Sequence, residues 1–480
     1  MRFIVENFGP IKHADIKLKN LNIFVGKNST GKSYLTYLIW SLLAVEPDWE
    51  KLRAIFDEYI PNEVIRYAIE MDKEIYEKMK KKKNFDFKKY IDELHEINEK
   101  ISRMIKNLIL DVFKRFDEIW GKNLEELLKD IFFVDNLREL IRVGEDKARV
   151  IVCDDQCEMK IHFEIDSNGL RSWIDEKALN ELENNVFITI VSGNPMLLTV
   201  YYYKDSDEYT YDVFFSENYQ IVKIIPIIFS WIFDYYPYTS TFIAPDGRAG
   251  LVRSREAYMH ALLSGGVVIN EVDRRFTRFL ESLYPKIKNK EISKFADFLE
   301  SKLGVRYIIR REPPRYLILI ENLEIPIQRA PSGYRELAPL VYAMRYGLDE
   351  GYVVFIEEPE AHLHPDAQVL IIRTLAGLSK FVNIIITTHS ITVLDEISNL
   401  LKVRNLPKDK KKKLGYEEWE GLNPENVGLF LFSEGNVKEL EVYEDGIEET
   451  ELDRVIIEIA NMHARVEEEY EYFSKLHTRE

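Results

Sequence analysis

The sequence predicts an α/β protein: a mixed sheet with flanking helices, interrupted by an inserted helical hairpin and a β-rich lobe. Three observations support this fold class. Short apolar runs typical of strands buried on both faces precede helix-forming runs near residues 21–44 and 353–386. The stretch 47–145 is polar and helix-forming, whereas 148–215 is rich in β-branched and aromatic residues in two hairpin-like patterns.

Composition narrows the class of protein. The chain has 480 residues, more than one hydrophobic core usually holds, and its 46% hydrophobic content excludes a disordered or fibrous chain. A net charge of −17 argues against coating nucleic acid with the whole surface and leaves a local basic groove open. The N-terminus has no signal-peptide core, and the longest apolar run, 224–233, contains Pro226. We expect a cytoplasmic protein that starts at Met1 and has no membrane span.

The composition shifts along the chain suggest six segments. Within the helical one, apolar residues recur at steps of four and three from Tyr90 to Leu108. A helical hairpin packed on the rest of the protein is favoured over a protruding arm that grips a partner or DNA. For the basic cluster at 80–83, a solvated face or turn is favoured over a patch that binds nucleic acid. The predicted segments are 1–46 (first part of the core), 47–145 (helical insertion), 146–250 (β-rich lobe), 251–310 (helical), 311–400 (second part of the core) and 401–480 (strands and a final acidic helix, with a basic linker at 408–413).

The two cysteines, Cys153 and Cys157, flank a turn between two alternating apolar stretches. This spacing predicts a hairpin with the thiols opposite each other, so a strand-bridging disulfide is geometrically allowed. Reduced structural thiols are favoured because we expect a cytosolic protein, although the Glu-, Lys- and Ile-rich composition hints at a thermophile. Two cysteines alone do not make a zinc site.

Residues 26–33 spell GKNSTGKS, which matches G-x-x-x-x-G-K-S between an apolar strand at 21–25 and a helix-forming run at 34–44. Glycines let such a loop wrap phosphates with its backbone N–H groups pointing inward, helped by the positive end of the following helix. The lysine can reach the β- and γ-phosphates, and the following serine can ligate Mg²⁺. The sequence therefore predicts an ATP and Mg²⁺ site that includes Gly26, Lys27, Asn28, Ser29, Thr30, Gly31, Lys32 and Ser33.

A second candidate element is the stretch VVFIEEPEAHLHP at 353–365. Four apolar residues predict a strand buried on both faces, and Glu357 and Glu358 follow at its carboxyl end. Ligands of open α/β sheets bind at that end of the strands. The two carboxylates are thus placed to meet a metal and a phosphate, although taken alone they could be solvated loop charges.

Four further residues lie at element ends. Ser332 and Gly333 start a predicted helix that ends near residue 346, and exposed N–H groups at a helix start can bind an anion. His389 follows a strand at 382–386, where an imidazole can hydrogen-bond a γ-phosphate. Arg248 follows a short strand in a glycine-containing loop; contact with the nucleotide and a structural ion pair are equally compatible with it.

Together, GKNSTGKS, PSGYREL, FIEEPEAHLHP and TTHS in this order resemble the ABC-type P-loop ATPase heads of the SMC, RecF and OLD families, most closely the soluble OLD-like and RecF-like ATPases. The resemblance covers the N-terminal strands, the P-loop and about residues 241–432, but not the helical insertion. It implies hydrolysis of ATP to ADP and phosphate with Mg²⁺. The signature departs from L-S-G-G-[QE], because Tyr334 and Arg335 replace Gly and Gln or Glu.

The resemblance also implies individual roles. Lys32 and Ser33 would contact the phosphates and Mg²⁺, Glu357 would be the Walker B carboxylate on the metal side, and Glu358 the general base. His389 would be the switch histidine, and Ser332 with Gly333 the signature that meets the γ-phosphate of the opposite subunit. No Q-loop glutamine is evident; Gln156 and Gln220 are weak candidates.

Zinc binding is the alternative for the histidines after the acidic pair. His362 and His364 are spaced i,i+2, which does not place both on one helix face. The family resemblance accounts for both without a structural metal, so zinc is disfavoured.

The sequence thus predicts a soluble Mg²⁺-ATPase whose ATP-driven assembly into a homodimer or higher homo-oligomer regulates a partner, in DNA repair or in defence against foreign DNA. OLD-family nucleases carry a nuclease domain after the head, and too few residues follow here, so a separate nuclease or toxin is expected as effector. Contact with DNA stays open. The alternative is an ATP-assembled scaffold that sequesters such an effector with little turnover. A transporter subunit is disfavoured by the insertion of roughly a hundred residues.

Overall fold

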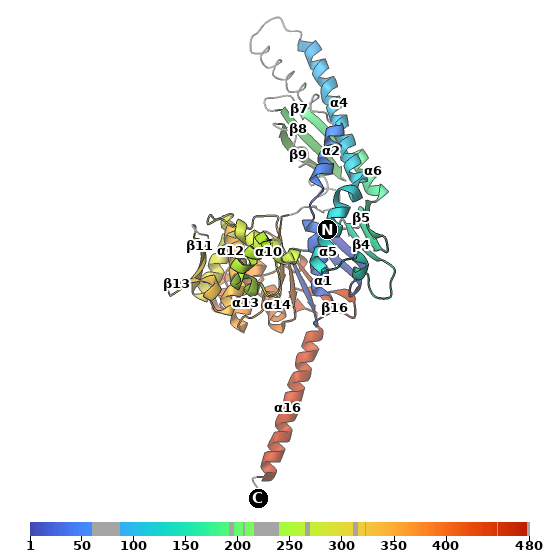
Figure 1. Ribbon diagram of the computed structural model, residues 1–480. Coiled ribbons are helices and arrows are strands. Elements are labelled where there is room, and N and C mark those ends of the chain that lie inside the picture. Colours follow the sequence, from blue (N-terminus) through green and yellow to red (C-terminus); the bar gives the residue numbers. More distant parts are fainter. Residues whose placement is uncertain are drawn as a thin grey trace. The chain divides into compact units, whose positions relative to one another are not determined.

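The computed structural model describes residues 1–59, 87–191, 196–204, 207–215, 240–264, 269–310, 315–321, 323–448 and 450–477 (Figure 1). The chain divides into two units, Met1–Lys17 with Tyr37–Thr239 and Leu18–Thr36 with Ser240–Glu480. The basic cluster at 80–83, the apolar run at 224–233 and the candidate Gln220 lie outside the described residues. Among the helices that are described, none combines the length and apolar character needed to cross a membrane.

The second unit is built on a mostly parallel sheet. Its strands run in the order β10-β14-β15-β3-β16-β17, with every neighbouring pair parallel except β16 and β17. All residues of β3 and β14 are buried, as expected for strands covered on both faces. The strand bounds are β3 (Leu21–Gly26), β10 (Thr241–Ala244), β14 (Val353–Glu357), β15 (Asn383–Thr388), β16 (Val427–Ser433) and β17 (Asn436–Leu440).

Helices of this unit follow the strands, as the predicted α/β class requires. Helix α1 (Lys32–Ala44) begins after β3 and passes into the first unit at Tyr37, while the helices after β14 and β15 pack on each other. The bounds are α8 (Arg248–Arg253), α9 (Arg255–Ser264), α10 (Glu271–Ser282), α11 (Lys290–Leu303), α12 (Ser332–Tyr346), α13 (Pro365–Leu378) and α14 (Ile391–Val403). A small antiparallel sheet is added by β11 (Val305–Arg310), β12 (Arg315–Ile320) and β13 (Leu323–Pro326).

The basic stretch at residues 408–413 differs from its prediction. The basic stretch predicted as a linker forms the short helix α15 (Lys408–Lys413), because Lys411 is buried and donates to the carbonyls of Glu418 and Glu420. The final predicted helix is observed as α16 (Glu451–His477), after β18 (Val442–Tyr443) and β19 (Gly446–Ile447).

The first unit combines antiparallel strands with the helical insertion. Strands run in the order β2-β1-β4-β5-β6 in one sheet and β7-β8-β9 in another. Helix α4 packs on α2, α6 and β7, and its Ile101 and Leu108 are buried, so this part of the insertion is packed as predicted. The bounds are β1 (Arg2–Phe8), β2 (Ile11–Lys17), β4 (Ala148–Cys153), β5 (Lys160–Asp166), β6 (Gly169–Ile174), β7 (Val186–Val191), β8 (Met196–Lys204), β9 (Asp207–Phe215), α2 (Trp49–Tyr59), α4 (Phe87–Lys114), α5 (Lys122–Phe132) and α6 (Glu176–Asn185).

The sequence predicts two strands over residues 2–25, with a turn at Gly9-Pro10, but the structure has three strands over residues 2–26. The alternating pattern is broken at residues 18–20, where the side chain of buried Asn22 accepts a hydrogen bond from the N–H of Lys19 and donates to its carbonyl. The same amide also donates to the carbonyl of Ile384 on β15. This bond ties β3 to the parallel sheet.

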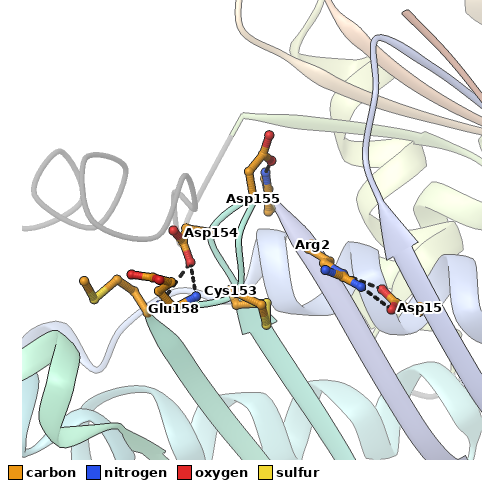
Figure 2. Close-up of a disulfide and its surroundings, with 9 residues drawn as sticks. Arg2, Asp15, Cys153, Asp154, Asp155 and Glu158 are labelled. Carbon is orange, nitrogen blue, oxygen red and sulfur yellow. Dashed lines mark hydrogen bonds and ion pairs between the residues drawn. A yellow bond between two sulfur atoms is a disulfide. The ribbon is translucent and has the colours of Figure 1, made fainter. Parts of the chain in front are cut away.

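The cysteine prediction was partly wrong. The predicted hairpin exists as β4 and β5, but Cys153 and Cys157 form a disulfide where reduced thiols were favoured (Figure 2). The thiols are not on opposite strands: Cys153 pairs with Lys160, and Cys157 lies in the loop at φ +57°. The Asp154 carboxylate accepts hydrogen bonds from the N–H groups of Glu158 and Met159. The bent loop brings the two cysteine Cα atoms to 4.9 Å, within disulfide range.

Candidate functional site

The P-loop joins β3 to α1 in the second unit and has the backbone that a phosphate cradle needs. Gly26 has a φ of +153° and Gly31 of +102°, conformations that only glycine adopts readily. A Cβ on Gly26 would lie 2.5 Å from the carbonyl oxygen of Phe432. Within the loop, the Thr30 hydroxyl donates to the carbonyl of Lys27 at 2.8 Å. The loop is therefore tightly curved and pre-shaped.

Lys32 is folded back onto this loop. Its Nζ donates to the carbonyl oxygens of Gly26 at 2.7 Å and Lys27 at 2.8 Å, and its side chain is mostly buried. Burial lowers the pKa of Lys32, while the nearby carboxylates of Glu358, Glu360 and Glu357 oppose that shift. The structure thus brings the predicted phosphate-binding lysine next to both predicted acidic residues.

The two acidic residues occupy different positions at the end of β14. Glu357 is the last strand residue, pairs with Thr387 of β15, and is buried. Its Oε2 accepts a hydrogen bond from the N–H of Asp246 at 3.2 Å. Glu358 leaves the strand with a φ of +43°, and its N–H donates to the carbonyl of Thr387 at 3.0 Å. This turn directs the two side chains differently although they are adjacent in sequence.

His389 follows the neighbouring strand, β15, and its ring reaches Glu358. The distance between His389 Nδ1 and Glu358 Oε1 is 3.1 Å, and both side chains are partly exposed. Because a carboxylate oxygen accepts, Nδ1 donates in this pair and Nε2 is left as the acceptor nitrogen of the neutral ring. The parallel pairing of β14 with β15 brings the two residues together.

Glu360 is part of the site although the sequence analysis gave it no role. It is buried, and the Thr388 hydroxyl donates to its Oε1. Its Oε2 has no hydrogen-bond partner in the described structure, and burial raises its pKa. The third carboxylate of the EEPE sequence was the available signal.

Arg248 makes an ion pair at the base of the site. Its side chain is fully buried, and Nε lies 3.2 Å from Glu336 Oε2. Nη1 donates to the carbonyl of Glu357 at 2.7 Å, and Nη2 to that of Glu358 at 3.1 Å. Of the two alternatives for Arg248, the structure contains the ion pair. It also links α12, which carries Glu336, to the end of β14.

Ser332 and Gly333 lie at the start of α12, a helix of 15 residues. Ser332 is exposed, and a Cβ on Gly333 would lie 3.4 Å from the carbonyl oxygen of His362. His362 Nδ1 is 3.0 Å from Glu336 Oε1. A groove of about 380 Å³ at this helix start is lined partly by Gly333, Tyr334, Leu363 and His364. Ser332 of the predicted signature is thus exposed, and Gly333 lies next to the loop after β14.

The donor atoms near the P-loop suit Mg²⁺. Ser33 offers an exposed hydroxyl and Glu357 a buried carboxylate, and hard oxygen ligands are what this ion prefers. Asp273 on α10 is a neighbour that the sequence did not indicate: burial raises its pKa, and Glu357 adds to that shift. Within the described residues no group of three or more His, Cys, Asp or Glu side chains could hold a metal by itself. Gln156 belongs to the first unit, in the loop after β4.

Comparison with known proteins places the chain in a family. A family model described as the AAA ATPase domain matches residues 1–151 and 257–394, more than half of the chain. The chain belongs to the AAA ATPase domain family. The matched residues of this AAA ATPase include the P-loop, Glu357, Glu358 and His389, and omit Arg248. The predicted α/β ATPase is confirmed at this level. No curated protein matches the sequence.

Solved structures of SMC heads and RecF are similar to this AAA ATPase. An SMC head bound to the C-winged helix domain of ScpA has 12% identity and a TM-score of 0.40, covering 91% of this chain and 96% of that one. The SMC head domain from Thermotoga maritima has 11% identity and a TM-score of 0.34, and the match covers 92% of this chain and 98% of that one. The recombination mediator protein RecF has 12% identity and a TM-score of 0.32, and the match covers 91% of this chain and 97% of that one. Similarity of this strength assigns no role to any residue of this chain.

Proposed function

We propose that this AAA ATPase hydrolyses ATP as an ABC-type head, with Glu358 as general base. The supporting observation is the hydrogen bond between His389 and Glu358 at the ends of neighbouring parallel strands, next to Lys32. A base must be held within hydrogen-bond reach of the proton that it takes, and a second group often orients it. His389 supplies that orienting contact.

Each site residue has a defined task in this proposal. Lys32 exchanges its bonds to the carbonyls of Gly26 and Lys27 for phosphate oxygens, and the N–H groups of the loop bind the same phosphates. Glu358 takes a proton from the attacking water. His389 holds the Glu358 carboxylate through Nδ1, and its Nε2, when protonated, donates toward the γ-phosphate. Ser33 and Glu357 would hold Mg²⁺, which would supply positive charge beside the phosphate oxygens.

We further propose that ATP joins two copies of the chain. Ser332 and Gly333 start a long helix, and the N–H groups of that end bind anions. They are directed to the γ-phosphate held by a second copy, and assembly regulates a separate effector, a nuclease or toxin, in DNA repair or in defence against foreign DNA. The alternative is a scaffold that assembles on ATP with little turnover.

Turnover separates the two proposals. An enzyme of this class releases phosphate at about 1 s⁻¹ or faster with Mg²⁺, whereas a scaffold releases almost none. Removing Mg²⁺ with EDTA abolishes release if Ser33 and Glu357 act through the ion. A wild-type chain that binds ATP and releases no phosphate at any Mg²⁺ concentration supports the scaffold and contradicts hydrolysis.

The two-copy arrangement needs its own experiment. Chains carrying Asn28→Cys are mixed with chains carrying Ser332→Cys, both with Glu358→Gln to prevent hydrolysis, and treated with a short bis-maleimide. We expect a cross-link between the two kinds of chain with ATP and none with ADP. Equal cross-linking with either nucleotide contradicts ATP-driven assembly through the signature, and it leaves the hydrolysis proposal standing.

A further inference from the structure

The helix α16, labelled in Figure 1, carries a stripe of exposed apolar side chains. Its members are spaced by three, four, four and three residues, so they lie on one face of the helix. Every one of these side chains is more than half exposed, and half-buried Val455 extends the stripe by four residues. Contiguous exposed apolar surface of this kind marks an interaction site. The stripe consists of Ile459, Met462, Val466, Tyr470 and Phe473.

A row of exposed charges runs along one edge of the stripe and indicates its occupant. The residues are Arg454, Glu458, Arg465 and Glu469, at spacings of four, seven and four. These spacings are the same in both directions, and the signs alternate. A second α16 laid antiparallel therefore places Arg454 opposite Glu469 and Glu458 opposite Arg465, and two-fold symmetry repeats both pairs.

A parallel arrangement lacks this match. It sets the row against the other edge of the stripe, where His463 and Glu467 already contact each other, with Nε2 and Oε1 3.5 Å apart. In the antiparallel arrangement the symmetry axis falls between Asn461 and Met462. The apolar side chains of the two copies then alternate along the length of the paired helices, so they can interdigitate.

We propose that α16 pairs antiparallel with α16 of a second copy of this chain, without any need for nucleotide. The pairing goes beyond the ATP-driven contact proposed above, because it uses a different surface. It would keep two ATPase units tethered between rounds of nucleotide binding, which raises the effective concentration of one for the other.

Charge reversal tests the pairing in the full-length chain without nucleotide. Sedimentation equilibrium should show a dimer for the wild type. The dissociation constant of the dimer should be about tenfold higher for Arg465→Glu and for Glu458→Arg, because each variant places like charges opposite each other at both symmetry-related pairs of residues 458 and 465. The double variant Arg465→Glu/Glu458→Arg should restore the wild-type affinity. Glu468→Arg, on the opposite face of the helix, is the matched control and should change nothing. A monomeric wild type, or a double variant weaker than either single one, overturns the proposal.

Cross-linking tests the direction. With a short bis-maleimide, Met462→Cys should cross-link to its own copy, because it lies at the symmetry axis. Phe473→Cys should not, because antiparallel pairing separates the two copies of residue 473 by about 35 Å at 1.5 Å per residue. Self-cross-linking of both variants means parallel pairing, and cross-linking of neither means that another protein covers the stripe; each result overturns the proposal. Neither bears on the ATP-dependent cross-link from Ser332.

Discussion

The guanidinium of Arg248 donates a hydrogen bond to the main-chain carbonyl of Glu358 at 3.1 Å, while its Nε contacts the carboxylate of Glu336. Glu358 has a φ of +43°, a conformation that a glutamate adopts only when its surroundings impose it. Arg248 is one source of that constraint. It joins the start of α12 to Glu358, the proposed general base, although the two lie on different elements.

Replacing Arg248 by lysine should therefore lower kcat with little change in KM. Lysine keeps the charge but not the forked geometry, so the backbone of Glu358 shifts; a displacement near 1 Å costs up to about a hundredfold in rate. Steady-state phosphate release at varied ATP gives both constants. A proportional rise in KM with unchanged kcat would mean that Arg248 acts on nucleotide binding.

Arg248→Met is the comparison for stability. Removing the guanidinium leaves Glu336 as a buried carboxylate with His362 as its remaining contact, and breaking a buried pair costs about 3–5 kcal/mol. Chemical denaturation should show this loss for Arg248→Met and a smaller one for Arg248→Lys. Equal losses for the two variants would show that the charge of residue 248 contributes nothing to stability.

Two glycine substitutions should have different effects. In Gly26→Ala the new Cβ meets the carbonyl of Phe432 at 2.5 Å and the φ of +153° is strained, so the variant should lose about 1–3 kcal/mol of stability and most ATP binding. In Gly333→Ala the nearest atom is the His362 carbonyl oxygen at 3.4 Å, an ordinary contact. Thermal denaturation and nucleotide titration compare the two. Normal ATP binding by Gly26→Ala would contradict the close fit of the P-loop.

Sequence patterns predicted the parts of this site that depend on local structure. The sequence predicts a helix over residues 365–378 after the acidic pair, and α13 has these bounds, with His364 as its cap and Pro365 as its first residue. Glu358 and His389 were each expected at the carboxyl end of a strand, but their contact was not predicted; the parallel pairing of β14 with β15 produces it. Arg248 and Glu336 meet across 88 residues of sequence, and burial together with Glu357 raises the pKa of Asp273 on α10; neither relationship leaves a local signal. The disulfide was not favoured because cytosolic proteins rarely contain one, and this expectation outweighed the close spacing of the two cysteines.

The Cys153–Cys157 disulfide should stabilise the first unit without affecting catalysis. It closes a very short loop, for which the chain-entropy model gives about 2 kcal/mol, and it lies in a different unit from the P-loop. The variant Cys153→Ser/Cys157→Ser should unfold at lower denaturant concentration and keep its kcat. Treatment of the wild type with dithiothreitol is the control and should have the same effect. A fall in kcat would contradict this separation.

Phosphate release by Glu358→Gln, measured together with ATP affinity, tests the central claim most directly. Glutamine keeps the size of the side chain and cannot take a proton, so kcat should fall by about 10²–10⁴ while ATP binds at least as tightly as to the wild type. Glu396→Gln is the matched control, because Glu396 is a buried carboxylate on α14 that contacts Tyr416, and this variant should retain most of the activity. Unchanged phosphate release by Glu358→Gln would contradict the assignment of Glu358 as the general base.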